Sequence, residues 1–368
     1  MEVGREQALA YRVAAHNLHR RLPAGSAEEA AAVAGLQDLP PGSASAALAA
    51  RVDGAQPGDL DALVIVYSFR GAAIAVPRRD LAVFTTALLP PDEAAARTLI
   101  GSATESLDAA GIGAQDALER VSAAVADALS AEPLARDAFH QALRERLPAD
   151  LLWWCRGCGS HHVHPLLWRA TGVTGVLSVA GREGRTTVFG APPAAPKVAD
   201  PAAELTRRFL HAYGPAGHSE LAAWAGVAPD HARALLARVE DETEEVTFDG
   251  RPRRILAADA ERLADPPAAS GVRLLPGYDP YLDQRDRDTL LPDRELRARV
   301  RRPIGNPGVV LVDGDLAGLW RPAKKGRRLV LTVEPVTPAA RRAADAIDAE
   351  AALLAPHRGC EVAEVKWA

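Results

Sequence analysis

The chain has 368 residues and a formal net charge of −5, and it is too long for one ordinary hydrophobic core, so we expect two to four domains. The charge excludes a highly basic nucleic-acid coat protein but leaves room for a local basic face. The chain has no long apolar run and only three cysteines, which argues against a membrane-spanning helix and a disulfide framework, and we expect a cytoplasmic protein.

The first ninety residues predict three helices followed by a hairpin. One helix is expected over residues 7–22, a second after Ser26, which begins a capping box, and a third from Ser43, which can cap "ASAALAARV". The strands "LVIVYSF" and "AAIAVP" are joined at the Arg70–Gly71 turn. A winged helix has this element order: two helices, a turn, a third helix and a hairpin.

The same order is predicted twice more. The second copy has helices over residues 116–130 and 134–146, then "HHVHPLLWRATG" and a hairpin, and a Pro/Ala linker leads to the third copy. From about Gly271 the chain predicts mostly strands, with hairpins at Asp313–Gly314 and Lys325–Gly326. We therefore expect an α+β fold in which three tandem winged-helix domains precede a β-rich C-terminal domain. The expected boundaries are residues 1–90, 91–192, 193–268 and 269–368.

With these elements in place, the chain resembles the AlkZ/YcaQ-like tandem winged-helix DNA glycosylases over nearly its whole length. The resemblance rests on "GLQDLPPGSASAALAARV", "YSFRGAAIAVP", "WCRGCGSHHVHPLLWRATG", "RRFLHAYGPAGHSELAAWAGV", "LPGYDPYLDQRD" and "NPGVVLVDGDLAGLWRPAKKG". It implies three winged helices around a concave surface for double-stranded DNA. It also implies hydrolytic excision of bulky N-alkylated purines, or unhooking of interstrand crosslinks, by a monomer without a metal or organic cofactor.

The resemblance assigns the candidate catalytic residues to one turn. Active members carry Gln-x-Gln or Gln-x-Asp before the third helix of the first winged helix, and the second polar residue places the attacking water. Here Gln37 matches the first position and Asp38 falls at the middle one, while Leu39 occupies the second polar position and cannot hold water. We take Gln37 and Asp38 as the catalytic candidates. Alternatively, Asp38 caps the helix that starts near Pro40 or Pro41, and Gln37 caps the end of the preceding helix.

Leu39 also supports an alternative function from a different class. A non-catalytic DNA-binding or regulatory protein with winged helices could keep this scaffold after losing the residue that positions water. Retention of Gln37 and of the whole scaffold favours the enzyme.

Candidate phosphate contacts lie on turns and helix starts. Arg70 is expected at the tip of the first wing, and "RPAKKGRR" has no acidic residue between Arg321 and Arg328. A histidine at the start of the third helix of the second copy would meet DNA phosphates. The full set of DNA-binding candidates is Arg70, Ser43, His161, His162, Lys324, Lys325, Arg327 and Arg328.

A C-x2-C motif precedes a histidine cluster in the second copy. Zinc favours the ligand types of Cys155, Cys158, His161, His162 and His164, but no second ligand pair follows at the usual spacing. A helix starting at His161, capped by Ser160, would also compete with metal binding. We therefore interpret the thiols as buried under the adjacent tryptophans and expect no metal.

The stretch "GYDPYLDQRD" combines Tyr278, Asp279, Tyr281 and Asp283. Such a cluster can indicate a metal or active site. A Tyr-Asp-Pro turn more often joins elements and is satisfied internally, so we interpret it as structural.

Overall fold

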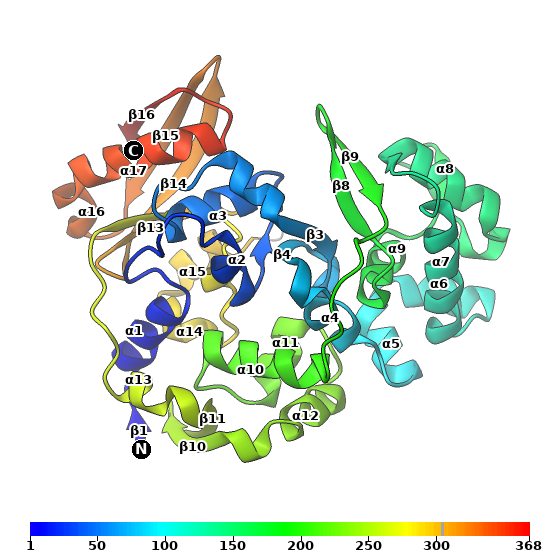
Figure 1. Cartoon of the computed structure of the whole chain (residues 1–368), viewed down its shortest axis with the longest axis horizontal. Coiled ribbons are helices and arrows are strands. Elements are labelled where there is room, and N and C mark those ends of the chain that lie inside the picture. Colours follow the sequence, from blue (N-terminus) through cyan, green and yellow to red (C-terminus); the bar gives the residue numbers. More distant parts are fainter. Residues whose placement is uncertain (303–304) are drawn as a thin grey trace. The chain divides into compact units, whose positions relative to one another are not determined.

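The computed structural model describes residues 1–302 and 305–368, and the chain forms two compact units (Figure 1). Each unit is assembled from separate segments of the sequence. Unit 1 comprises residues 1–63, 207–220 and 241–368, and unit 2 comprises residues 64–206 and 221–240.

The order of three helices and a hairpin occurs three times along the chain. The first set is α1 (Arg5–Ala15), α2 (Ala27–Ala32), α3 (Ser43–Arg51), β3 (Leu63–Tyr67) and β4 (Ala73–Pro77). The second is α7 (Ala114–Ala128), α8 (Arg136–Arg146), α9 (Pro165–Ala170), β8 (Ser178–Glu183) and β9 (Thr186–Gly190). The third is α10 (Pro201–Tyr213), α11 (His218–Ala225), α12 (Pro229–Ala237), β10 (Thr243–Phe248) and β11 (Arg251–Leu256). The mixed α+β class is thus confirmed.

Other short helices and strands lie within and between these sets, at the amino terminus and after the third set. They are β1 (Glu2–Val3), β2 (Leu36–Gln37), α4 (Leu81–Phe84), α5 (Glu93–Ile100), α6 (Ala103–Ala110), β5 (Leu134–Ala135), β6 (Trp153–Cys155), β7 (Ser160–His162), α13 (Ala260–Ala264), α14 (Arg287–Leu290) and α15 (Arg294–Val300). The first helix is shorter than the expected 7–22 because Asn17 has a left-handed backbone with φ of 57°. No helix among the described residues has the length and apolar character needed to cross a bilayer.

The C-terminal sheet organises unit 1. Its strands lie in the order β12 (Val272–Leu275), β13 (Gly308–Val312), β14 (Asp315–Lys325), β15 (Arg328–Pro335) and β16 (Val362–Trp367). Neighbours are antiparallel except β15 and β16, which are parallel. A parallel pair needs a long crossover, and α16 (Pro338–Arg342) and α17 (Ala344–His357) provide it. Figure 1 shows α17 lying along this sheet.

Both faces of the sheet are buried. Val310 belongs to the core under α17, whereas its neighbours Val309 and Leu311 belong to the core on the opposite face, as the alternation of a strand requires. Gly308 is needed for close packing, because a Cβ atom there would lie 2.1 Å from the ring of Trp320. A central strand covered on both faces explains the continuous apolar run "GVVLV".

Unit 2 joins the hairpins of the first and second sets in one sheet. Within unit 2 the strands of this sheet run β4, β3, β8, β9 and β5, and β3 pairs antiparallel with β8 through Ile65 and Val179. The core beside this sheet gathers Phe139, Trp168 and Phe189, with Phe139 and Phe189 ring centroids 4.7 Å apart. The sequence predicted separate hairpins and did not reveal this shared sheet.

The burial of His16 in unit 1 predicts that the folded protein loses stability in acid. The ring of His16 is 1% exposed and lies between Tyr213 and Tyr281, with centroids 5.2 and 5.6 Å away. Burial, followed by the charge of Arg51, holds the pKa of His16 well below its usual 6.5. The native protein therefore keeps His16 neutral in a range where the unfolded chain binds a proton.

The stability that His16 contributes is complete above pH 6.5 and is lost as pH falls towards the lower, folded-state pKa. We expect the free energy of unfolding, measured in urea, to fall between about pH 7 and about pH 5, and His16→Phe to flatten this slope. Equal slopes for the two proteins would contradict the assignment.

Candidate active site and nucleic-acid interface

The Gln37–Leu39 turn places its three side chains in different environments. Gln37 ends β2 and is half-buried, Asp38 is 2% exposed, and Leu39 is 49% exposed. Oδ1 of Asp38 accepts hydrogen bonds from the backbone N–H groups of Gly42 (2.7 Å) and Ala44 (3.3 Å). The capping interpretation of Asp38 is therefore confirmed, because the carboxylate satisfies amides at the start of α3.

Arg358, which follows α17, interacts electrostatically with the carboxylate of Asp38. Burial lowers the pKa of Arg358, and the negative charge of Asp38 opposes part of this shift. The adjacent His357 shares a hydrogen bond between Nδ1 and Ser45 Oγ at 2.7 Å, and its Nε2 lies 3.1 Å from the carbonyl of Ala55. The sequence offered no signal for Arg358, because the two positions are brought together only by the packing of α17 near α3.

Ser43 does not have its expected role. It is the first residue of α3, with left-handed Gly42 as the N-cap, and its Oγ has no hydrogen-bond partner in the part of the chain that the structure describes. The expectation that Ser43 caps α3 is wrong, because Asp38 supplies the acceptor. At 1% exposure, the hydroxyl is also not accessible to a DNA phosphate in this conformation.

Asp279 of the Tyr-Asp-Pro turn is used internally. Its carboxylate forms a bidentate ion pair with Arg51 at the end of α3, with both N–O distances 2.7 Å and both side chains buried. Oδ1 also accepts the backbone N–H of Tyr281 at 3.0 Å. The structural interpretation of Asp279 is confirmed, and this pair anchors the helix that follows the Gln37–Leu39 turn.

Arg70 packs against its own unit. It lies between β3 and β4 with φ of 55°, and its guanidinium is 5.1 Å from the ring centroid of Phe69, which in turn packs on Trp224 at 4.6 Å. A Cβ atom on Gly226 would approach Arg70 Cγ to 2.6 Å. Much of the arginine stem is therefore covered, although the residue remains partly exposed.

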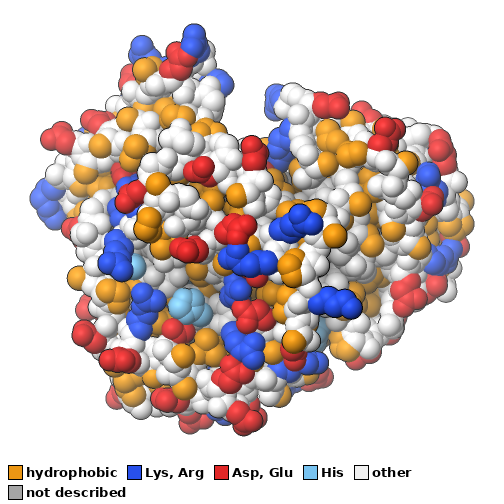
Figure 2. All heavy atoms as spheres, in the orientation of Figure 1, with side chains coloured by type: hydrophobic (Ala, Val, Ile, Leu, Met, Phe, Trp, Pro, Cys, Tyr) orange, Lys and Arg blue, Asp and Glu red, His pale blue; other side chains and the backbone are white. Residues whose placement is uncertain are grey.

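The basic hairpin of β14 and β15 forms ion pairs with acidic residues from a later segment of the chain. Arg327 forms an ion pair with Glu361, Arg328 pairs with Glu364 at 3.0 Å, and Lys324 donates to a backbone carbonyl. Figure 2 shows basic and acidic side chains together at the projecting tip. The expectation of an uncompensated basic run is corrected, because the segment leading into β16 and β16 itself supply the acids. The four basic side chains, Lys324, Lys325, Arg327 and Arg328, are all exposed.

The cysteine motif forms a hairpin where a helix was expected. Ser160–His162 pairs with Trp153–Cys155, and α9 begins only at Pro165, with His164 Nδ1 accepting from Leu166 N–H at 3.2 Å. The helix start at His161 and the Ser160 cap are therefore wrong. Proline favours the first helical position, and this signal could have located the start.

The thiols of this hairpin are not buried. The prediction that they lie buried under the adjacent tryptophans is therefore wrong. Cys158 is exposed, Cys155 is partly exposed, and Trp154 is 58% exposed. The exposed His161 lies against Trp154, with ring centroids 5.1 Å apart, whereas His162 lies with the two cysteines. A hydrogen bond with His162 is the largest of the effects that lower the pKa of Cys155 to about 7.

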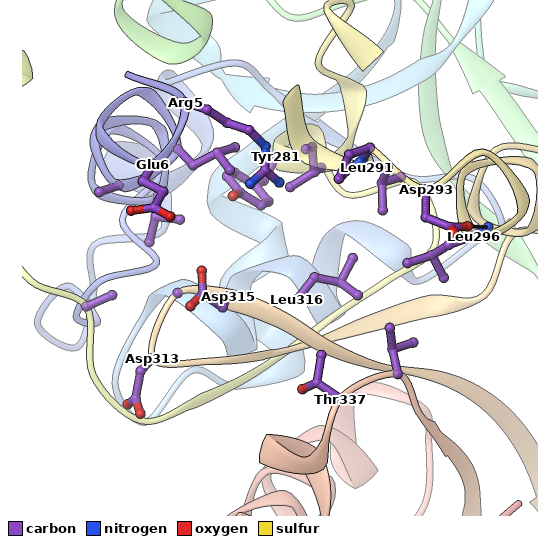
Figure 3. Close-up of a pocket in the computed structure, with 18 residues that line it drawn as sticks. Arg5, Glu6, Tyr281, Leu291, Asp293, Leu296, Asp313, Asp315, Leu316 and Thr337 are labelled. Carbon is purple, nitrogen blue, oxygen red and sulfur yellow. Dashed lines mark hydrogen bonds between the residues drawn. The ribbon is translucent and has the colours of Figure 1, made fainter. Parts of the chain in front are cut away.

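A cavity of about 670 Å³ in unit 1 is separate from the Gln37–Leu39 turn. Figure 3 shows Arg5 and Tyr281 on one side of it and Asp313 and Asp315 on another. Arg5 donates through Nε to the carbonyl of Thr289 at 2.7 Å. The acidic side chains make this cavity poorly suited to phosphate.

Most of the chain matches a family of DNA glycosylases. The chain belongs to the family described as DNA glycosylase AlkZ-like, which matches residues 30–357 and so includes the Gln37–Leu39 turn. The resemblance inferred from the sequence is thus confirmed.

The chain is similar to a protein sequence and to a solved structure, both from Streptomyces sahachiroi. An "Interstrand DNA cross-link repair glycosylase" is 31% identical over 211 residues, which are 53% of this chain and 54% of the relative, so the match spans about half the length of each protein. The structure of "DNA glycosylase AlkZ" has a TM-score of 0.76 at 22% identity and covers 100% of both chains. The second similarity concerns the fold alone.

Proposed function

We propose that the chain is a monomeric DNA glycosylase that excises bulky N-alkylated purines from duplex DNA or unhooks interstrand crosslinks. One observation carries the proposal: the family match includes the turn that bears Gln37. The three helix–hairpin sets, within residues 1–90, 91–192 and 193–268, would act as winged-helix domains, and residues 269–368 would support them. Their repeated element order supports this division.

The proposed chemistry needs little from the protein. An N7-alkylated purine is a good leaving group because the base already carries a positive charge. The site therefore has only to stabilise an oxocarbenium-like sugar and to hold a water molecule. Gln37, half-buried at the end of β2, would orient that water through its amide. Asp38 would act mainly by fixing the start of α3, since its Oδ1 accepts two backbone amides.

The proposed phosphate contacts are basic residues that are exposed or, in the case of Arg70, partly exposed. Lys324, Lys325, Arg327 and Arg328 lie on the tip of the β14–β15 hairpin, and exposed ion pairs such as Arg328–Glu364 are weak enough for a phosphate to replace the carboxylate. His161, which is exposed beside α9, and Arg70 would add contacts in unit 2.

Gln37→Ala should lower the release of alkylated base about 100-fold, because a misplaced water loses the geometry for attack. Release is measured from a duplex with one N7-methylguanine and from a crosslinked duplex. Gln56→Ala, which removes an exposed amide outside the turn, is the matched control and should leave the rate unchanged. Equal rates for wild type and Gln37→Ala would contradict the role of Gln37.

The turn also favours a second candidate, a non-catalytic DNA-binding protein. Leu39 is exposed where the family carries a polar side chain, and Asp38 is buried and occupied by capping. This candidate predicts salt-dependent binding to duplex DNA without base release above buffer. Binding that shows no dependence on salt would contradict both candidates.

A further inference from the structure

The hairpin of β6 and β7 brings three metal-ligand side chains to one place in unit 2. Trp153 pairs with His162, Trp154 with His161 and Cys155 with Ser160. Because alternate residues of a strand face opposite sides, Cys155 and His162 share a face and His161 points to the other. Cys158 lies in the turn between the strands and completes the group.

The geometry is close to that of a bound zinc ion. The ligand atoms of Cys155, Cys158 and His162 all lie within 4.8 Å of one another. Tetrahedral zinc with bonds of about 2.3 Å to sulfur and about 2.0 Å to nitrogen requires separations of roughly 3.3–3.8 Å. Small side-chain rotations are sufficient to reach these values.

A backbone contact orients the ring of His162 so that Nε2 can bind a metal. Its Nδ1 lies 2.8 Å from the carbonyl oxygen of Val163. A carbonyl can only accept, so a neutral imidazole in this contact carries its proton on Nδ1 and presents the lone pair of Nε2. A histidine that donates its second nitrogen to a backbone carbonyl is the usual arrangement around protein-bound zinc.

The turn brings the two sulfurs within 4.8 Å of each other. Gly159 donates its N–H to the carbonyl of Cys155 at 2.9 Å and has φ of 62°, which reverses the chain directly after Cys158. Each strand has only three residues, and an isolated pair of such strands is marginal in water. A metal that joins the two strands to the turn would stabilise this hairpin.

We propose that Cys155, Cys158 and His162 bind one Zn²⁺ ion, with water as the fourth ligand. The cysteines bind as thiolates and release their protons to solvent. The ion would fix the hairpin directly before α9, independently of the hydrolytic reaction. This proposal replaces the expectation of no metal, which rested on a helix starting at His161, on buried thiols and on the absence of a second ligand pair; water takes the place of the fourth protein ligand.

The test is cobalt and zinc binding by the full-length chain, purified under reducing conditions and stripped of metal. Titration with Co²⁺ should reach one equivalent and give the thiolate charge-transfer absorption of a tetrahedral site, and Zn²⁺ should displace the cobalt. Cys158→Ser and His162→Gln should each weaken Zn²⁺ affinity more than about 100-fold, beyond the usual effect of losing an outer-shell partner.

Two matched variants separate this site from other thiols and imidazoles. His161→Gln changes the neighbouring histidine on the opposite face, and Cys360→Ser removes the buried cysteine of unit 1, and both should bind metal as wild type does. Absence of cobalt–thiolate absorption in the reduced wild type, with circular dichroism showing a folded chain, would overturn the proposal. An equal loss in His161→Gln and His162→Gln would overturn the ligand assignment.

Discussion

Asp279→Ala is expected to lower the free energy of unfolding by about 3–5 kcal/mol, because it leaves a buried guanidinium without its counter-ion. Arg51 and Asp279 are 1% and 0% exposed at their side chains, and the two bonds between them are 2.7 Å long. The substitution also removes the acceptor for the N–H of Tyr281. The loss is measured from the midpoint of urea unfolding at an unchanged slope.

Asp283→Ala is the control for this prediction. Asp283 follows on the same turn and pairs with Arg285, but its side chain is 22% exposed, so water can replace the lost contact and the effect should be much smaller. Asp279→Asn, which keeps the shape and one acceptor oxygen, should fall between the two. Equal losses for Asp279→Ala and Asp283→Ala would show that the buried pair has no special role in stability.

Leu39→Asp is expected to raise the rate of base release by at least about 100-fold, the lower end of what a positioned proton-transfer group contributes. The substitution creates the Gln-x-Asp pattern of the active family members, and Leu39 is already 49% exposed, so a carboxylate would be hydrated rather than buried. The measurement is single-turnover release of N7-methylguanine from a duplex, with protein in excess.

Leu39→Asn provides the matched comparison, because it has nearly the same size but cannot accept a proton. We expect it to raise the rate less than Leu39→Asp does, and both variants to keep the duplex affinity of the wild type. If Leu39→Asp binds DNA normally and its rate stays at the wild-type value, position 39 does not control water placement in this chain.

Features decided by neighbouring residues could be predicted from the sequence. The Asp313–Gly314 hairpin is one, because both residues have positive φ and only a few residue types adopt it readily. The cap on α3 by Asp38 is another, since donor and acceptor lie within six residues. The helix start near His161 was misjudged because a run of histidines has weak conformational preference, whereas Pro165 carried the real signal.

Features that depend on distant segments could not be predicted. Glu361 and Glu364 reach the basic hairpin only because β16 pairs in parallel with β15, and no local pattern specifies that partner. The approach of Arg358 to Asp38 and the pairing of β3 with β8 have the same origin. The sequence therefore predicts the turn and its capping carboxylate, while the electrostatic surroundings of the turn depend on the tertiary fold.

The three-segment composition of unit 1 has a consequence for the order in which the chain matures during synthesis. The Arg51–Asp279 pair closes across 228 positions, so α3 reaches its partner only after most of the polypeptide has left the ribosome. Unit 2 uses residues 64–206 and 221–240 and is completed earlier. The amino-terminal helices therefore leave the ribosome before the segments that bury their apolar side chains, and we expect chaperones to bind at this stage.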